Sequence, residues 1–355
     1  MQTFSVIMAG GGGTRFWPLS RQSMPKQILN ISGNDVLINE TIRRYEGIID
    51  FDKTYIVTNA QQEKSLKELL IKEVPPENIF LEPVGRNTAP CILLAAMNIW
   101  KQHGDGIMCV FPADSYITMQ EEFQRILKKA CQAAQEDGKL ITLGIKPTFP
   151  STGYGYIHYE SGAANEIYRV KEFVEKPPFE KARMYIKDGN YLWNSGIFIW
   201  KVSTIIENFK RFLPRIYEKL SEIQEDLGTA IMQKRIDEIY PQLQNISIDY
   251  GIMERSNEVL VIPCDFGWSD IGSWDAMGAI FPSDENGNIV RGEHIVIDTV
   301  DSIIYSSGRL VTTVGLKEMI VVSTEDALMV CPKDRAQDVK LIVEELKKQK
   351  RTNLL

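Results

Sequence analysis

Positive charge is in short supply in this 355-residue sequence. Its 40 Lys and Arg residues are outnumbered by 47 Asp and Glu residues, which gives a formal net charge of −7. Proteins that bind nucleic acids or anionic membranes nonspecifically carry a basic surplus instead. We therefore expect neither kind of partner, and any anion-binding site must be a local concentration of cations.

Cysteine and histidine are also sparse. The five cysteines are scattered along the sequence, and no two of them have the C-x-x-C spacing of a zinc site. Their odd number and wide separation also argue against a disulfide framework, so we expect buried thiols in a reducing compartment. The three histidines fall outside the motifs identified below as catalytic.

Long apolar runs are missing as well. No stretch approaches the roughly 18 apolar residues that a membrane-spanning helix needs. The first apolar run, "FSVIMAG" at residues 4–10, lacks the charged leader and the long apolar core of a signal peptide, and it is typical of a buried strand. We therefore expect a cytoplasmic protein with no membrane partner.

Strands and helices alternate over about the first 145 residues. Short apolar runs such as "KTYIVTN" and "GIMCVFPAD" are separated by amphipathic segments such as "QQEKSLKELLIKE". This alternation predicts an α/β fold with a Rossmann-like, mostly parallel mixed sheet flanked by helices. Ligands of such sheets bind beyond the carboxyl ends of the strands, where Gly10–Gly13 and Asp114 would both lie.

The pattern changes in the second half of the chain. "GYGYIHYE", "VKEFVEK" and "SGIFIWK" indicate strands of an inserted or extended sheet, and "PSDENGN" at residues 282–288 is a polar, turn-rich boundary. Beyond it, short β segments at near-regular spacing are closed by a helix, which indicates a solenoid such as a left-handed β-helix, or a small sandwich. We expect a catalytic domain over residues 1–283 and a small β-rich domain over residues 284–355.

Four consecutive glycines, Gly10–Gly13, follow the first strand, and Arg15 and Lys26 come soon after them. A Walker A loop ends in G-K-[ST], whereas Gly13 is followed by Thr14 and Arg15. A dinucleotide fingerprint fails too, because Arg15 or Phe16 would occupy the place of its last glycine. A bare backbone can approach a ligand closely, and the two cations indicate that the ligand is negative. The segment therefore predicts a phosphate-binding loop of another type.

Eight segments place the sequence beside a known family. In chain order they are "AGGGGTRFWPLSRQSMPKQIL", "EPVGRNTAP", "FPAD", "TGYGYI", "VEKP", "WNSGIF", "SIDYGIME" and "GWSDIGSW". Their order and spacing resemble those of the mannose-1-phosphate guanylyltransferases in the sugar-nucleotidyltransferase superfamily, from residue 4 to about residue 332. The resemblance implies transfer of GMP from GTP to mannose 1-phosphate, giving GDP-mannose and pyrophosphate. Longer relatives carry an isomerase domain after this region, and we expect this chain to end before it.

The implied reaction is in-line attack of the sugar phosphate on the α-phosphorus of GTP. A phosphate monoester is largely a dianion at neutral pH, so no general base is needed. The barrier is mainly repulsion between two phosphate groups, which cations and oriented N–H groups reduce. Arg15 and Lys26 are therefore the catalytic candidates. Gly10, Gly11, Gly12, Gly13 and Thr14 are expected to bind the nucleotide.

Two acids are candidates for binding Mg²⁺, which usually accompanies nucleotides and takes oxygen ligands. Asp114 ends a predicted strand, and Asp270 lies in "GWSDIGSW". The alternatives are that Asp114 caps a helix and that Asp270 is only a turn residue. The resemblance favours metal binding at both positions.

Guanine presents two adjacent donors, N1–H and N2–H₂, which one carboxylate can accept side by side. Glu82, just past a predicted strand, is the candidate for this role, and Asn87 and Thr88 could complete the base contacts. The alternative for Asn87 and Thr88 is that each only caps the helix that follows.

Four residues are candidates for the sugar phosphate. Lys176 in "VEKP" can pair with the phosphate, Glu175 can accept hydrogen bonds from hydroxyls, Gly155 allows close approach, and Asn194 in "WNSG" can donate and accept. The alternative for "VEKP" is a solvated turn. Arg21 could bind phosphate or only anchor the loop.

Two other functions stay open on the sequence. One is a sibling transferase that uses another base or another sugar 1-phosphate. The other is a non-catalytic regulatory protein that binds a nucleotide sugar. That second function predicts damaged cations or acids, whereas Arg15, Lys26, Asp114 and Asp270 are all present. The apolar C-terminal β segments indicate an interface, so we expect a homodimer.

Overall fold

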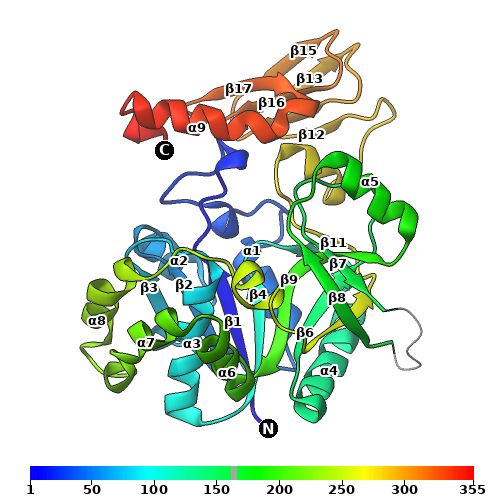
Figure 1. The fold of residues 1–355 in the computed structure, drawn as a ribbon. Helices are drawn as coiled ribbons and strands as arrows, with labels where there is room; N and C mark the ends of the chain where they lie inside the picture. Colours follow the sequence, from blue (N-terminus) through cyan, green and yellow to red (C-terminus); the bar gives the residue numbers. More distant parts are fainter. Residues whose placement is uncertain (161–165) are drawn as a thin grey trace.

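The computed structural model of the protein describes residues 1–160 and 166–355, and its centre is a mixed β-sheet. Within these residues the sheet has the strand order β3-β2-β1-β4-β9-β6-β10-β8-β7 (Figure 1). All strands run in one direction except β8 and β9. The strands are β1 (Thr3–Ala9), β2 (Thr54–Asn59), β3 (Ile79–Glu82), β4 (Ile107–Pro112), β6 (Leu140–Ile145), β7 (Tyr156–Tyr159), β8 (Tyr168–Val174), β9 (Tyr191–Lys201) and β10 (Val259–Cys264).

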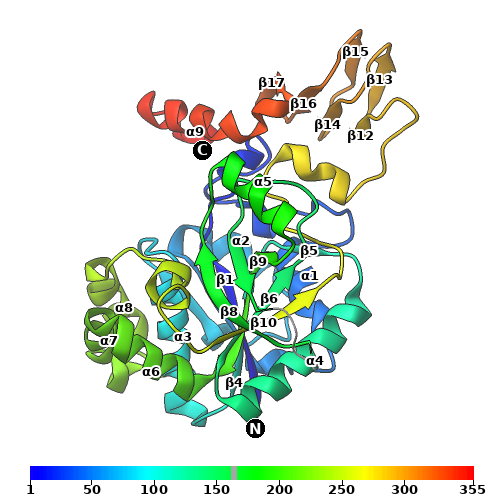
Figure 2. The same cartoon turned by 45° about the vertical axis from the view of Figure 1, so that its right-hand side comes forward.

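Helices cover both faces of this sheet (Figure 2). Side chains alternate between the faces along a strand, so Phe4 and Val6 of β1 join one apolar cluster and Ile7 and Ala9 join the other. The first cluster contains residues of α3 (Thr88–His103), α6 (Val202–Phe212), α7 (Pro214–Ser221) and α8 (Met232–Ile239). The second contains residues of α1 (Leu37–Arg44), α2 (Glu63–Leu69), α4 (Gln120–Asp137) and α5 (Phe179–Asp188). Among the described residues, no helix combines the length and the apolar character needed to cross a bilayer.

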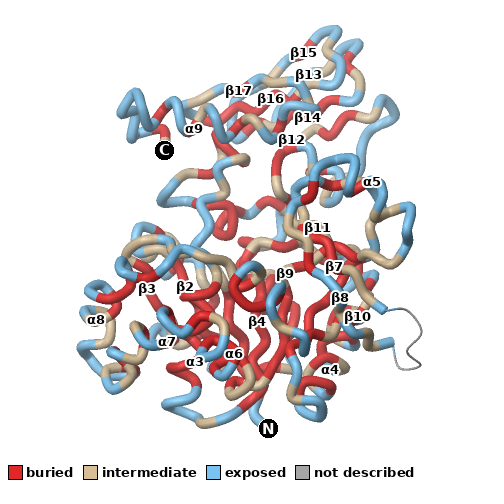
Figure 3. Tube along the Cα trace, viewed as in Figure 1, coloured by how far each residue is buried: buried red, intermediate tan, exposed pale blue. Residues whose placement is uncertain are grey.

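Burial on both faces explains the near-continuous apolar sequences of the central strands (Figure 3). The predicted α/β fold, with helices flanking a mostly parallel mixed sheet, is confirmed. The strands expected in an inserted or extended sheet join this one sheet. The segment "SGIFIWK" belongs to β9, which lies antiparallel between β4 and β6 in the middle of the sheet.

Residues after the central sheet form the C-terminal β region, defined here as residues 289–348. Strands β12, β14 and β16 pair in parallel, with Ile289, Ile303 and Ile320 in register. Strand β13 pairs in parallel with β15, and β17 runs antiparallel to β16. Parallel pairing of successive segments is the arrangement of a solenoid rather than of a sandwich. The elements are β12 (Ile289–Arg291), β13 (His294–Ile297), β14 (Ile303–Ser306), β15 (Val311–Val314), β16 (Met319–Ser323), β17 (Leu328–Pro332), the 3₁₀ segment η10 (Lys333–Asp338) and α9 (Val339–Lys348).

A third apolar cluster joins the C-terminal β region to the loop that follows β1. Phe16 and Trp17 of that loop pack with Trp274 and with residues of the β region such as Ile303 and Val343. Figure 1 shows this loop, in blue, reaching up to the C-terminal strands and α9. This loop, which we call the glycine loop (residues 10–25), is therefore held between the central sheet and the C-terminal β region.

Candidate active site

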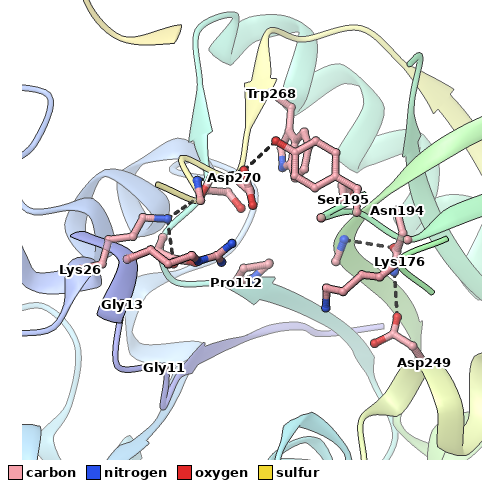
Figure 4. A pocket seen from close by; sticks show the side chains of 18 of the residues that line it. Gly11, Gly13, Lys26, Pro112, Lys176, Asn194, Ser195, Asp249, Trp268 and Asp270 are labelled. Atoms are coloured by element: carbon pink, nitrogen blue, oxygen red, sulfur yellow. Dashed lines mark hydrogen bonds and ion pairs between the residues drawn. The ribbon is translucent and has the colours of Figure 1, made fainter. Parts of the chain in front are cut away.

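A cavity of about 380 Å³ opens where β1 and β4 end. It brings together residues from segments that are far apart in the sequence. Figure 4 shows Lys26 and Asp270 on one side of this cavity and Lys176, Asn194 and Asp249 on the other. The predicted site residues that line it are Gly11, Gly13, Thr14, Arg15, Lys26, Asp114, Gly155, Glu175, Lys176, Asn194 and Asp270.

Lys26 connects the two acids predicted to bind metal. It begins the 3₁₀ turn η2 (Lys26–Ile28), and only 4% of its side chain is exposed. The Nζ atom donates a hydrogen bond to Asp114 Oδ2 at 2.9 Å and another to the backbone carbonyl of Asp270. A buried ammonium group needs such partners, because desolvation without them is very unfavourable. The fold therefore brings Lys26 together with Asp114 and Asp270.

Asp270 is held firmly in the cavity wall. Its Oδ1 atom accepts hydrogen bonds from Tyr154 Oη at 2.8 Å and from the backbone N–H of Gly272 at 3.0 Å. Burial raises the pKa of Asp270, the nearby Asp114 raises it further, and Lys26 and Tyr154 act in the opposite direction. Sequence reasoning missed Tyr154, although it belongs to the quoted segment "TGYGYI".

The backbone on each side of the cavity is strained at one residue. Ile271, directly after Asp270, has a φ of 41°, and Lys176 has a φ of 44°. A β-branched residue with positive φ is rare and persists only where the surroundings hold it. The side chain of Ile271 is fully buried in the third apolar cluster. Packing at that position therefore fixes the loop that presents Asp270.

The opposite wall carries the residues predicted for the sugar phosphate. Lys176 Nζ lies 2.6 Å from Glu175 Oε1, and the backbone N–H of Asn194 donates to the carbonyl of Gly155 at 2.8 Å. A Cβ atom at Gly155 would lie 2.6 Å from Glu175 Oε2 and 3.4 Å from Asn194 Cβ, so the glycine backbone lies close to both side chains. Asp249 was not predicted as a site residue.

Asp249 comes from the quoted segment "SIDYGIME" and orients Asn194. Its Oδ1 atom accepts a hydrogen bond from Asn194 Nδ2 at 2.7 Å. Burial raises the pKa of Asp249 to about 6, and the charge of Glu175 adds to this increase. The segment was a visible signal in the sequence, but the partner of its acid depends on the fold.

The glycine loop is shaped by a buried amide that sequence reasoning did not single out. Gln27 Nε2 donates to the carbonyls of Ala9 at 2.6 Å and Gly11 at 3.0 Å. Gly13 has a φ of 57°, and a Cβ atom there would lie 2.6 Å from Lys26 Cβ. The loop therefore needs glycine at position 13 because of both its conformation and its contact with Lys26.

The remaining predicted nucleotide residues do not line the cavity. Glu82 is buried beneath Gly10, and Tyr240 donates a hydrogen bond to its Oε1 atom. Asn87 Oδ1 accepts from the N–H of Thr88 as a helix cap, and Thr88 Oγ1 accepts from the N–H of Ile248. The base contacts of Glu82, Asn87 and Thr88 stay predictions, as do the roles of Gly10 and Gly12.

The two arginines of the loop both contact the C-terminal β region. Arg15 Nη1 donates to Gln337 Oε1 at 2.7 Å. Arg21 pairs with Asp326 at 2.8 Å and donates to the carbonyls of Pro18 and Ser20. These contacts favour the anchoring alternative for Arg21.

Comparisons with known proteins identify the family of the chain. The family model for nucleotidyl transferases matches residues 4–287, and the model for the MannoseP isomerase/GMP-like beta-helix domain matches residues 292–346. The chain is 38% identical to the mannose-1-phosphate guanylyltransferase of Escherichia coli (strain K12) and 39% identical to that of Salmonella typhimurium. Each match covers 97% of this chain and 73% of the relative.

A solved structure is similar along nearly the whole chain. The crystal structure of a Thermus thermophilus protein described as mannose-1-phosphate geranyltransferase has a TM-score of 0.89 and 34% sequence identity, and the match covers 98% of this chain and all of that one. Of the two C-terminal folds that the sequence left open, the beta-helix match confirms the solenoid. Together, the family model and these relatives show that the chain belongs to the nucleotidyl transferase family and, within it, to the mannose-1-phosphate guanylyltransferases.

Proposed function

We propose that this protein transfers GMP from GTP to mannose 1-phosphate, forming GDP-mannose and pyrophosphate. An oxygen of the sugar phosphate forms a bond to the α-phosphorus of GTP. The bond that breaks joins this phosphorus to the oxygen that bridges it to the β-phosphorus. The electron pair leaves with pyrophosphate. The observation that carries the proposal is one cavity lined by Arg15 and Lys26 near the glycine loop and by Lys176 on the opposite wall.

The placement of these cations suits the main obstacle of the reaction. Two unit negative charges at 4 Å repel each other by about 4 kcal/mol at an effective dielectric constant near 20. A sugar phosphate dianion that approaches a triphosphate meets several such pairs. Arg15 and Lys26 would offset the charge of the triphosphate, and Lys176 would offset that of the sugar phosphate.

The acids Asp114 and Asp270 fit a divalent ion, which we propose to be Mg²⁺. In the described residues, Asp270 Oδ2 and Asp114 Oδ1 accept no hydrogen bond, so one oxygen of each carboxylate is available. Those residues contain no cluster of three or more metal-ligating side chains. Mg²⁺ is commonly bound by one or two carboxylates together with phosphate oxygens and water, and it would neutralise phosphate charge here.

Specificity for the base and the sugar would come from two separate sets of residues. Glu82 would accept the two donors of guanine, with Asn87 and Thr88 close by. Glu175 and Asn194 would bind sugar hydroxyls, and Asp249 would keep the amide of Asn194 in place. The similarity to mannose-1-phosphate guanylyltransferases supports GTP and mannose 1-phosphate over the substrates of a sibling transferase.

We also propose a catalytic domain over residues 1–283, a β-rich domain over residues 284–355, a cytoplasmic location and a homodimer. All five cysteines are free thiols, which supports a reducing compartment. Apolar side chains that are at least half exposed on and near β13 and β15 support an interface in the β-rich domain; they are Ile295, Ile297, Leu310 and Val314.

One assay tests the activity. Pyrophosphate release is measured with each of GTP, ATP, UTP and dTTP, paired with mannose 1-phosphate or glucose 1-phosphate. We expect the highest kcat/KM for GTP with mannose 1-phosphate. A higher value for another pair would show a sibling activity, and no turnover with any pair would support the regulatory alternative.

Replacing the acids tests the site. Asp114→Asn and Asp270→Asn should each lower kcat at least about 100-fold, because each removes a carboxylate that would hold the metal, and the metal would offset the negative charge of the phosphates. The KM for GTP should change much less. Asp137→Asn, an exposed acid at the end of α4, is the matched control and should retain wild-type kinetics. Near-normal turnover of Asp114→Asn or Asp270→Asn at saturating Mg²⁺ would remove that residue from the site.

A further inference from the structure

A side chain of the C-terminal β region reaches the proposed catalytic site. Gln337 lies in η10, and its Oε1 atom accepts the hydrogen bond from Arg15 Nη1 at 2.7 Å. Its Nε2 atom donates to Ser273 Oγ at 2.6 Å. Ser273 follows Asp270 and Gly272, which line the cavity. One amide therefore connects the loop that carries Arg15 to the loop that carries Asp270.

The chemistry of an amide suits this position. The oxygen of Gln337 can accept from a guanidinium group while its nitrogen donates to a hydroxyl, and it does so without a charge. A carboxylate there would pair with Arg15 and compete with the phosphates for it. Among the residues that the structure describes, the Arg15 guanidinium has a single hydrogen-bond partner, Gln337. A long arginine side chain without such a partner samples several rotamers.

Residues next to Gln337 in the sequence are buried, although its own side chain is exposed. Ala336 and Val339, on either side of it, are buried in the third apolar cluster together with Phe16, the residue after Arg15. Nearby, Trp17 Nε1 donates to the carbonyl of Leu354 at 2.9 Å. The segments that carry Arg15 and Gln337 are therefore packed directly against each other.

We propose that Gln337 is a positioning residue for Arg15 and that the C-terminal β region thereby completes the triphosphate-binding site. Gln337 holds the Arg15 guanidinium toward the cavity and leaves its charge free for the phosphates of GTP. This inference rests on the proposed function, because it assigns Arg15 to the triphosphate.

Three variants test the inference by steady-state kinetics. Gln337→Ala should raise the KM for GTP and lower kcat, with a combined loss of kcat/KM of about tenfold, while the KM for mannose 1-phosphate stays within twofold. Gln337→Glu should raise the KM for GTP further than Gln337→Ala, because its carboxylate pairs with Arg15. A merely structural role predicts the reverse order, since Glu has nearly the same shape as Gln. Gln349→Ala, which removes an exposed glutamine directly after α9 that is bonded to Glu345, is the matched control and should behave as wild type.

A double-mutant cycle tests whether Gln337 acts through Arg15. The Kd for GTP is measured by calorimetry, without sugar phosphate, for wild type, Arg15→Ala, Gln337→Ala and the double variant. We expect the weakening caused by Gln337→Ala to fall to less than twofold in the Arg15→Ala background. An equal weakening in both backgrounds, or unchanged GTP binding and kinetics of Gln337→Ala, would overturn the proposal.

These results stay separable from the proposed function. If the wild-type protein binds GTP but forms no GDP-mannose, the proposed function fails, and the cycle still decides the role of Gln337. If the wild-type protein does not bind GTP at all, both proposals fail. Circular dichroism melting curves of Gln337→Ala and Gln349→Ala should coincide with that of wild type, and a clear loss of stability in Gln337→Ala alone would indicate a structural role instead.

Discussion

Lys26 combines burial and charge in a single side chain. Lysine is almost never fully buried unless it is paired, and here Asp114 and the carbonyl of Asp270 provide the partners. The same ammonium group is within the cavity proposed for the phosphates. The sequence predicted that Lys26 is a functional cation. Its partners come from residues 88 and 244 positions away, and only the fold brings them to it.

Glu82 has an unusual titration that makes its proposed role testable. Burial raises its pKa to about 7, and the hydrogen bond from Tyr240 opposes this increase. The ionised form, which would accept two donors from guanine, dominates above pH 7 and is lost as the pH falls through 7. We therefore expect the KM for GTP to rise below pH 7, by up to about tenfold per pH unit.

Glu82→Gln provides the comparison for that profile. The variant should lack the pH dependence of the KM for GTP between pH 6 and 8, and its preference for GTP over ATP should fall about tenfold or more. Kinetics with both nucleotides across this pH range give the measurement. A wild-type KM that does not change with pH, or unchanged base discrimination in Glu82→Gln, would remove Glu82 from the base site.

The same pKa shift has a consequence for stability. Since the pKa of Glu82 in the folded protein lies above the ordinary value of 4.5, the stability that protonated Glu82 contributes is fully present below pH 4.5. It is lost as the pH rises through about 7. The wild-type protein should therefore lose stability relative to Glu82→Gln over this interval.

At the scale of elements, the glycine loop contains two glycines with different tasks. Gly13 has a φ of 57°, and a Cβ atom there would lie 2.6 Å from Lys26 Cβ. A Cβ atom at Gly11 would meet nothing within 4 Å. Gly13→Ala should lower the free energy of unfolding by about 1–3 kcal/mol and reduce activity, because both the backbone and Lys26 must shift.

Gly11→Ala serves as the matched control for the fold. Its free energy of unfolding should stay within about 0.5 kcal/mol of wild type. Urea denaturation monitored by circular dichroism measures the free energy of unfolding of both variants, and steady-state kinetics with GTP measure their activity. If the two variants were equally stable, the conformation assigned to the loop would be wrong.

The order of the strands in the sheet could not be predicted from the pattern of elements alone. The alternation of strands and helices correctly predicted the layers, because each buried strand needs an apolar helix on each face. The position of β9 between β4 and β6 was not predicted. Strand order depends on pairing across long stretches of chain, and an apolar strand sequence does not identify its neighbours.

For the molecule as a whole, the third apolar cluster packs the C-terminal β region against the loop that follows β1. Trp274 is fully buried in this cluster, with ring centroids 5.2 Å from Phe16 and 5.5 Å from Tyr305, and its Nε1 atom donates to the carbonyl of Trp17 at 3.1 Å. Trp274→Ala should lower the free energy of unfolding by about 3–5 kcal/mol, through lost packing and the cavity left behind.

The measurement combines calorimetry with activity at a temperature where the variant is still folded. We expect activity to fall as well, since Phe16 and Trp17 follow Arg15 directly. Trp100→Ala, on α3 and 42% exposed, is the control and should destabilise much less. A Trp274→Ala variant that is less stable but fully active would show that packing between the two parts does not support the site.

The α/β layers, a small β-rich C-terminal region and most of the residues that line the cavity could be predicted from the sequence, whereas the choice of a solenoid over a sandwich needed the strand pairing. These depend on local periodicity and on residue types whose charge or flexibility can be recognised directly. Only the tertiary structure decided which partners these residues contact. The hydrogen bonds are those of Tyr154 with Asp270, Asp249 with Asn194 and Gln337 with Arg15. Each partner lies in a different segment of the chain, and a hydrogen bond between distant segments leaves no spacing in the sequence from which it could be predicted.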